Sequence, residues 1–455
     1  MSFVAIDPAT GKTLSTHPLL DLEGALTAVR RAADAQRGWA TTSFTRRAAC
    51  LRALARLLRE RKEEYGRLMT SEMGKPLAQA VSEAEKCAWA AEYYAENAER
   101  FLAPVPARTD ASRSYWAHRP LGVILGIMPW NFPFWQVVRF ATPAVAAGNA
   151  ALLKHAPGVP GCALALERLF QDAGFPEGVF SSLFIDTDVT GALIEDPAIA
   201  GVSLTGSVGA GKAVAARAGG ALKKCVLELG GSDASLVLAD ADLDHAVASC
   251  AFARLANTGQ SCIAAKRFIV VEEVREEFQE KLLARMGAVV MGDPLDPDSE
   301  IGPMARIDLR DQLHDQVVRS VEAGATLALG GELPDRPGAW YPATVLTGVG
   351  PGMPAYEEEL FGPVAAVLSA RDTEDAVRIA NDTRFGLGAS VYTRDDREGE
   401  RIAADLLQAG SCFVNGFVKS DPRLPFGGIK ESGYGRELSP LGILEFTNAK
   451  TVWVK

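Results

Sequence analysis

One cysteine of the chain lies in a short polar segment that could present a thiol to a substrate. Cys262 follows the residues NTGQS at 257–261, whereas Cys225 and Cys412 lie within apolar runs, as structural cysteines usually do. The thiolate is the nucleophilic form of cysteine, and an unperturbed thiol has a pKa near ~8.5, so a nucleophile here needs a base or a cation beside it. The local sequence leaves a nucleophile and a structural cysteine as equal alternatives.

The best candidate for the base is a carboxylate. Glu228 ends the apolar run CVLE directly before LGG, where a charged side chain is costly unless it has a function. Burial would raise its pKa and let it accept a proton from water or a thiol. The five histidines have no motif-like surroundings and are interpreted as surface or packing residues. A structural, hydrogen-bonded Glu228 is the alternative.

A fixed amide stands in the segment MPWNFPFWQVVR. Pro129 and Pro133 flank Asn131 and restrict the backbone on both sides. A rigid amide N–H could stabilise the oxyanion that forms when a nucleophile attacks a carbonyl group. The alternative is that Asn131 only caps a turn.

Two segments have the residues expected of a nucleotide-binding site. Gly206 and Ser207 begin a glycine-rich turn between a short apolar run and a helical pattern, which suits a phosphate at a helix N-terminus. The spacing differs from GxGxxG, so the motif alone is weak. Lys154 ends the run AALLK, where its ammonium group could bind a ribose or a phosphate, and a solvated lysine is the alternative.

These residues need a framework, and the apolar pattern predicts an α/β fold. Residues 21–103 space apolar residues three and four apart, as amphipathic helices do. From residue 121, short apolar runs alternate with helical segments, and a second such series runs from 234 to about 415, which predicts two parallel sheets built from βαβ units. The polar stretch 107–120 is interpreted as a two-stranded excursion, and the end of the chain alternates like an edge strand.

Composition excludes several classes of function. The 455 residues carry a net charge of −10 without a cluster of Lys or Arg, so we expect no nucleic-acid partner. No apolar run reaches the roughly 18 residues of a membrane span, and the first residues lack a secretory pattern, so we expect no membrane contact and a cytoplasmic location. The seven cysteines include no CxxC pair, so we expect neither a disulfide framework nor a metal site.

Taken together and in this order, the segments resemble the aldehyde dehydrogenase superfamily. The chain contains PWNFP, LLK, LTGS, LELGG, NTGQSC, EEELFGPV and PFGGIKESGYGRE, which extend from Pro129 to Glu437. The set is far more specific than any one of its members. The resemblance implies a Rossmann-type cofactor domain, an α/β catalytic domain and a small β element for oligomerisation.

The resemblance also implies a mechanism. Cys262 would attack an aldehyde to give a thiohemiacetal, whose oxyanion the Asn131 amide and the backbone N–H of Cys262 would hold. Hydride transfer to a nicotinamide would leave a thioester, and Glu228 would activate the water that releases the acid.

For the cofactor, the resemblance implies NAD or NADP. Glu359 is similar to the family's ligand of the nicotinamide ribose, Phe361 would lie beside the ring, and Lys154 is similar to the ligand of the adenosine ribose. The cofactor-binding residues expected are Trp130, Lys154, Gly206, Ser207, Glu359 and Phe361. Many NAD-preferring members have a Glu three residues after the lysine, and here Pro157 leaves NAD and NADP both open.

Within the superfamily, KHAPGVP and GQSCIAAKRFIV resemble succinate-semialdehyde dehydrogenases of bacterial type. In that subgroup an Arg at the place of Arg139 meets the distal carboxylate of the substrate, which charge-assisted pairing favours. Ser420 would add a hydrogen bond, and Trp135 and Phe417 would wall the channel. Some relatives have a second Arg where this chain has Ala256, which leaves a broad-specificity enzyme for neutral aldehydes as an alternative.

The expected domains are discontinuous. We assign 1–106 and 121–229 to cofactor binding, 230–419 to catalysis, 107–120 and 439–455 to oligomerisation, and 420–438 to a loop that returns to the cofactor domain. The lone terminal strand predicts a homodimer or homotetramer.

Three other functions stay in view. An acylating dehydrogenase would resolve the thioester with coenzyme A or phosphate, and Glu228 argues against it because such an enzyme needs no base for water. A catalytically silent binding protein on the same fold would not need Cys262, Glu228 and Asn131 together. A hydrolytic cysteine enzyme would need a Cys–His pair, which the sequence does not indicate.

Overall fold

The computed structural model describes residues 2–455, and its N-terminal part is helical, as the apolar spacing predicts. A hairpin of β1 (Ser2–Ile6) and β2 (Thr13–Pro18) is followed by α1 (Leu22–Ala40), α2 (Phe44–Glu60), α3 (Lys62–Met73) and α4 (Leu77–Phe101). The side chains of Asp21 and Ser43 begin α1 and α2, because each accepts a hydrogen bond from a backbone N–H three residues later.

Six strands form the first of two central sheets, in the order β17-β9-β8-β5-β6-β7. They are β5 (Val123–Met128), β6 (Ala150–His155), β7 (Phe180–Ser182), β8 (Ile199–Thr205), β9 (Lys224–Glu228) and β17 (Gly433–Tyr434). All pairs are parallel except β17 with β9. Its helices are α5 (Trp135–Ala146), α6 (Pro160–Asp172), α7 (Thr187–Glu195) and α8 (Val208–Gly220), and two apolar clusters bury the sheet.

Seven strands form the second sheet, in the order β12-β13-β14-β11-β10-β15-β16. They are β10 (Asp233–Val237), β11 (Ala265–Val271), β12 (Thr326–Leu329), β13 (Thr344–Thr347), β14 (Val364–Ala370), β15 (Gly388–Tyr392) and β16 (Ser411–Val414). Only β12 is antiparallel to its neighbour. The accompanying helices are α9 (Leu243–Leu255), α10 (Glu272–Gly287), α11 (Ile307–Glu322), α12 (Pro354–Glu357), α13 (Thr373–Asn381) and α14 (Asp396–Arg401).

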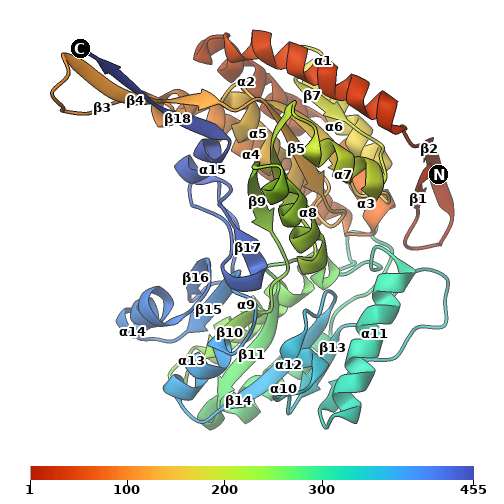
Figure 1. The fold of residues 1–455 in the computed structure, drawn as a ribbon. Coiled ribbons are helices and arrows are strands. Elements are labelled where there is room, and N and C mark those ends of the chain that lie inside the picture. Colours follow the sequence, from red (N-terminus) through yellow and green to blue (C-terminus); the bar gives the residue numbers. More distant parts are fainter. Residues whose placement is uncertain (1) are drawn as a thin grey trace.

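A third, three-stranded sheet projects from the body of the molecule (Figure 1). It pairs β18 (Thr447–Val454) with β4 (Arg113–Pro120), and β4 with β3 (Val105–Pro106), all antiparallel. The helix α15 (Ser439–Glu445) leads into β18. Trp116 is 40% exposed and Trp453 50% exposed on this sheet, so it presents apolar surface to its surroundings.

The α/β expectation is confirmed, and the two central sheets meet where the chain passes from β9 to β10. Figure 1 shows the first sheet and its helices above the second, with the blue strand β17 returning to β9 from the C-terminal part of the chain. The domain limits drawn from the sequence remain predictions. Within residues 2–455, every helix is too short or too polar to cross a membrane.

Candidate active site

Most of the predicted functional residues line one cavity of about 620 Å³. Asn131 reaches it from the segment after β5, Cys262 from the segment before β11, and Glu359 from the segment after α12. The cavity therefore lies between the two sheets, and residues far apart in the sequence meet in it. The predicted residues that line it are Trp130, Asn131, Gly206, Ser207, Cys262, Glu359 and Phe361.

The loop that carries Cys262 has an unusual backbone. Asn257 and Thr258 have φ values of 58° and 55°, and Gly259 follows at 72°, so two residues with a Cβ occupy the left-handed region. Such residues cost on the order of 1–3 kcal/mol each and persist only where their surroundings hold them. Here the buried Arg254 donates to the Gly259 carbonyl, and the Gln79 side chain accepts from the Asn257 N–H at 2.6 Å. The loop is thus fixed before any ligand binds.

A buried lysine fixes the carbonyl groups of the same loop. Lys266 Nζ donates to the Ser261 oxygen at 3.0 Å and to the Cys262 oxygen at 2.6 Å, and it lies 3.4 Å from Glu359 Oε1. Burial raises the pKa of the Cys262 thiol to about 12, and the positive charges of Arg139 and Lys266 oppose that rise. The structure therefore holds Cys262 as a neutral thiol that must lose its proton to react.

Asn131 is held by its neighbours rather than by a turn alone. Its Nδ2 donates to the Gln260 carbonyl at 3.0 Å, and its Oδ1 accepts from Gln136 Nε2 at 3.0 Å. Asn257 Nδ2 donates to the Asn131 backbone oxygen at 2.9 Å. An amide nitrogen has two hydrogens, so Asn131 keeps one for an oxyanion beside Cys262.

Glu228 lies at the end of β9 and is 2% exposed. Neither of its carboxylate oxygens has a hydrogen-bond partner among the described residues. Gly427 has a φ of 150°, and a Cβ there would stand 2.6 Å from Glu228 Oε1, so only glycine fits over the carboxylate. Burial raises the pKa of Glu228 well above its usual value, the Glu437 charge adds to that rise, and Arg139 opposes it. Glu228 does not line the cavity in this arrangement.

Arg139, the predicted ligand of a substrate carboxylate, has a carboxylate of the protein itself beside it. It forms a buried ion pair with Glu437 and donates from Nη2 to Thr205 Oγ1 at 3.3 Å. Its guanidinium also packs 4.5 Å from the centre of the Phe426 ring. Its charge is therefore already balanced where it lies on α5.

The cofactor residues fall into two groups. Ser207 caps α8 by accepting a hydrogen bond from the Ala210 N–H at 3.3 Å, and a Cβ on Gly209 would meet nothing within 4 Å, so the start of this helix is open to a ligand. Glu359 Oε1 accepts from the Gly231 N–H at 3.0 Å. Lys154, by contrast, is not part of the lining, and its Nζ lies 5.8 Å from the centre of the Phe3 ring.

The aromatic walls of the cavity are Trp130 and Phe361, whose ring centres lie 5.8 Å apart at an interplanar angle of 87°. Sequence reasoning did not single out several other lining residues, which are Val208, Lys212, Gln312, Gln316, Arg384 and Phe385. Of these residues, only Lys212 had a local sequence signal, because it follows the glycine-rich turn. The others belong to ordinary helical and loop patterns.

Two of the predicted substrate residues meet at a lysine that the sequence reasoning missed. Lys86 Nζ donates to Ser420 Oγ at 2.7 Å and lies 4.4 Å from the centre of the Trp135 ring. Phe417 packs against Phe252 at 5.0 Å between ring centres. Like Lys86, Trp135 and Ser420, it is not part of the cavity lining. Lys86 gave no sequence signal because it sits in the amphipathic pattern of α4.

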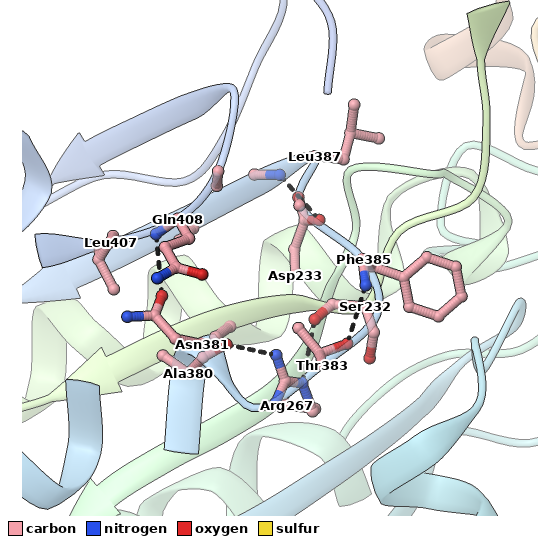
Figure 2. A pocket seen from close by; sticks show the side chains of 15 residues that line it. Ser232, Asp233, Arg267, Ala380, Asn381, Thr383, Phe385, Leu387, Leu407 and Gln408 are labelled. Atoms are coloured by element: carbon pink, nitrogen blue, oxygen red, sulfur yellow. Dashed lines mark hydrogen bonds between the residues drawn. The ribbon is translucent and has the colours of Figure 1, made fainter. Parts of the chain in front are cut away.

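A second, much smaller cavity of about 10 Å³ lies within the second sheet and its loops, and Figure 2 shows the side chains around it. Asp233 Oδ1 accepts from the Gly388 N–H at 3.0 Å, while its Oδ2 has no hydrogen-bond partner among residues 2–455. The Arg267 guanidinium donates hydrogen bonds to backbone oxygens, including that of Ser232 at 3.0 Å. The space is too small for a substrate, and Cys262 is not part of it.

The comparisons with known proteins agree with this geometry. Residues 1–452 match the family described as "Aldehyde dehydrogenase family". The chain is 48% identical over 450 residues to the NAD(P)+ succinate semialdehyde dehydrogenase Sad of Escherichia coli strain K12, covering 99% of this chain and 97% of that one. It is 49% identical over 457 residues to the NADP+ succinate-semialdehyde dehydrogenase of Mycobacterium leprae strain TN, covering 100% of both.

Among solved structures, the chain is similar to succinic semialdehyde dehydrogenase from Streptococcus pyogenes in complex with NADP+. The TM-score is 0.97 and the identity 37%, with 99% of each chain covered.

Proposed function

The chain belongs to the aldehyde dehydrogenase family, and from this premise we propose that it oxidises succinate semialdehyde to the acid with NAD or NADP. The observation that carries the proposal is the single cavity in which Cys262, Asn131, Glu359 and Phe361 meet. The full-length similarity to succinate-semialdehyde dehydrogenases supports the choice of substrate.

In the first half of the proposed reaction, the Cys262 thiol passes its proton to water in the cavity, and its sulfur forms a bond to the aldehyde carbon. The carbonyl oxygen becomes an oxyanion, and the free hydrogen of Asn131 Nδ2 and the backbone N–H of Cys262 donate to it. The rigid loop around Asn257 holds these donors in place, so little reorganisation is needed when charge develops. Loss of hydride from the same carbon then leaves a thioester on Cys262.

A dinucleotide fits the residues around the cavity. The open N-terminus of α8 at Ser207 suits a pyrophosphate, Glu359 suits a ribose hydroxyl, and Trp130 and Phe361 form apolar walls for a flat ring. The nicotinamide cofactor would supply the acceptor for the hydride. Pro157 offers no carboxylate to a ribose 2′-hydroxyl, so NAD and NADP remain equal candidates.

In the second half, Glu228 removes a proton from water while the water oxygen attacks the thioester carbon. The bond between that carbon and the Cys262 sulfur then breaks, and the carboxylic acid is released. Glu228 is suited to hold a proton because burial and Glu437 raise its pKa. It must turn toward Cys262 from its present position under Gly427 to do so.

The test is initial-rate reduction of NAD and of NADP, each with succinate semialdehyde and with butanal, a neutral aldehyde of equal carbon number. A kcat/KM for succinate semialdehyde about tenfold or more above that for butanal supports the proposal. Equal or higher values for butanal would keep the oxidation of aldehydes and overturn the substrate.

We further propose that the enzyme is a homodimer or homotetramer that works in the cytoplasm. The free edge of β18 and the exposed Trp116 and Trp453 support assembly through the third sheet. Seven free cysteines fit a reducing compartment. Light scattering of wild type and of Trp453→Glu tests the assembly, with Leu222→Glu, at a 95% exposed leucine, as the control. A wild-type monomer would overturn it.

A further inference from the structure

The substrate proposed above has a carboxylate at the end away from the aldehyde, and the structure offers a cation for it that is not Arg139. We propose that Lys86, held between Ser420 and Trp135, binds this distal carboxylate and thereby sets the preference for semialdehyde acids. The inference rests on the proposed function and names the residue that carries its selectivity.

Three separate segments build the position of Lys86. It lies on α4, Trp135 begins α5, and Ser420 lies in the chain between β16 and β17. Trp135 is 4% exposed and Ser420 is 6% exposed, while Lys86 is half-buried. The 2.7 Å hydrogen bond to Ser420 Oγ uses one of the three ammonium hydrogens of Lys86. The ammonium also lies over the face of the Trp135 indole, in a cation–π contact.

The charge of Lys86 is not balanced by any carboxylate. Among residues 2–455, every carboxylate oxygen is more than 4.0 Å from its Nζ. The acidic groups that influence Lys86 are committed elsewhere, since Glu83 pairs with the buried Lys75 and Asp421 pairs with Arg423 at 2.7 Å. A partly desolvated cation without a counter-ion is a favourable place for an incoming anion.

Arg139 differs from Lys86 in this respect. Its guanidinium is ion-paired with Glu437, so the pair offers a second carboxylate little net attraction. The Arg139 charge acts on both the Cys262 thiol and the Lys86 ammonium, which places Arg139 near each of them. Trp135, which Lys86 contacts, is four residues after Asn131 and belongs to the apolar cluster against which Cys262 packs. Lys86 therefore contacts a member of that cluster and, unlike Arg139, has no counter-ion.

The protonation of Lys86 gives the proposal a second signature. Burial and the nearby Arg139 lower the pKa of Lys86 to about 8, while Cys87, Glu83 and Asp421 oppose that decrease. The ammonium is thus the main form at pH 7 and is lost above pH 8. Affinity for a carboxylate should fall over that range, and affinity for a neutral aldehyde should not.

The test compares Lys86→Met with Lys419→Met, which removes the same charge from the exposed lysine next to Ser420. Lys86→Met should raise KM for succinate semialdehyde about tenfold or more and leave kcat and KM for butanal unchanged, as loss of a charge-assisted hydrogen bond predicts. Lys419→Met should behave as wild type with both substrates. Unchanged butanal kinetics also show that the variant is folded.

Lys86→Arg and Ser420→Ala keep the proposal testable if Lys86→Met does not fold. Lys86→Arg should retain a low KM for succinate semialdehyde and abolish its rise above pH 8, and Ser420→Ala should raise KM by a smaller factor. If Lys86→Met or Ser420→Ala keeps the wild-type preference for succinate semialdehyde, or if Lys86→Arg keeps the wild-type pH profile, Lys86 is not the ligand. If wild type itself does not prefer succinate semialdehyde over butanal, the proposed function fails first, and this inference fails with it.

Discussion

Arg139 and Glu437 form a buried ion pair beside the carboxyl group of Glu228. The two side chains are 3% and 5% exposed, and Ser203 Oγ donates to Glu437 Oε1 at 3.4 Å. Both charges act on Glu228, because Glu437 raises its pKa and Arg139 lowers it. The ion pair therefore acts on the pKa of Glu228 in two opposite directions, and it places a carboxylate of the protein beside the Arg139 side chain that was expected to bind the substrate's carboxylate.

Glu437→Gln should move the pH–rate profile toward lower pH. Removing the negative charge takes away one cause of the raised pKa of Glu228 and leaves Arg139 to favour its ionised form. We expect the rising limb of kcat to shift to lower pH by about one pH unit, while the melting temperature falls because a broken buried ion pair costs about 3–5 kcal/mol.

The control is Glu445→Gln, because Glu445 also raises the pKa of Glu228, but less than Glu437 does, and is paired with Lys224 at 2.9 Å. It should shift the profile in the same direction by less. A Glu437→Gln enzyme with the wild-type pH profile would show that the ion pair does not govern the base.

Glu228→Gln should stop the second half of the reaction and spare the first. Asn131, Cys262 and the loop that holds them do not involve the Glu228 side chain, so hydride transfer needs no change. Stopped-flow absorbance should show a burst of reduced cofactor close to one per site, followed by a steady-state rate lower by about 10²–10⁴. A variant without a burst would contradict the assignment of Glu228 to hydrolysis of the thioester.

Cys262→Ala should abolish turnover while the cofactor still binds. The loop is held by contacts of Arg254, Gln79 and Lys266 to backbone groups, so loss of one sulfur leaves the cavity intact. The expected decrease in kcat is at least about 10³-fold, and titration of NADP or NAD followed by protein fluorescence should give the wild-type Kd. Residual turnover near the wild-type rate would refute Cys262 as the nucleophile, and Cys412→Ala serves as the control.

The parts of the site that lie in contiguous motifs could be predicted from the sequence. PWNFP, LELGG and NTGQSC each combine a side chain with the turn that presents it. Each segment alone left a structural alternative open, and only the set in this order predicts Asn131, Glu228 and Cys262 as reacting groups. The α/β architecture followed from the alternation of apolar runs and helical patterns in the same way. In such segments the residues that shape the backbone and the reactive side chain stand next to each other, so both can be recognised in the sequence.

The contacts that depend on tertiary structure left no such signal. Lys86 belongs to an ordinary amphipathic helix, and it becomes a candidate ligand only through its hydrogen bond to Ser420, which lies more than 300 residues away in the sequence. Glu437 was visible only as the last letter of a glycine-rich motif, and its pairing with Arg139 required β17 to return to the first sheet. Arg139 was assigned by resemblance, and its role as a carboxylate ligand stays a prediction, because the sequence did not reveal the Glu437 carboxylate that pairs with it.

Asp233→Asn should change how stability depends on pH. Burial raises the pKa of Asp233 to about 6 in the folded enzyme, against 3.8 for the unperturbed group. The folded state therefore binds this proton more tightly than the unfolded state does. The resulting stabilisation is complete below pH 4 and is lost as pH rises through 6, and over that range it amounts to about 3 kcal/mol.

Asn at this position does not titrate, so the stability of the variant relative to wild type should improve between pH 4 and pH 7 by up to that amount. Urea unfolding of the ligand-free enzyme at several pH values measures the difference, with Asp298→Asn at an exposed site as the control. Figure 2 shows Asp233 between Leu387 and Ser232. The group is sensitive because it is 3% exposed and one of its oxygens has no partner among the described residues. A difference that stays constant with pH would mean that Asp233 is already ionised in the folded enzyme at pH 4, and that the field of Lys266 outweighs its burial.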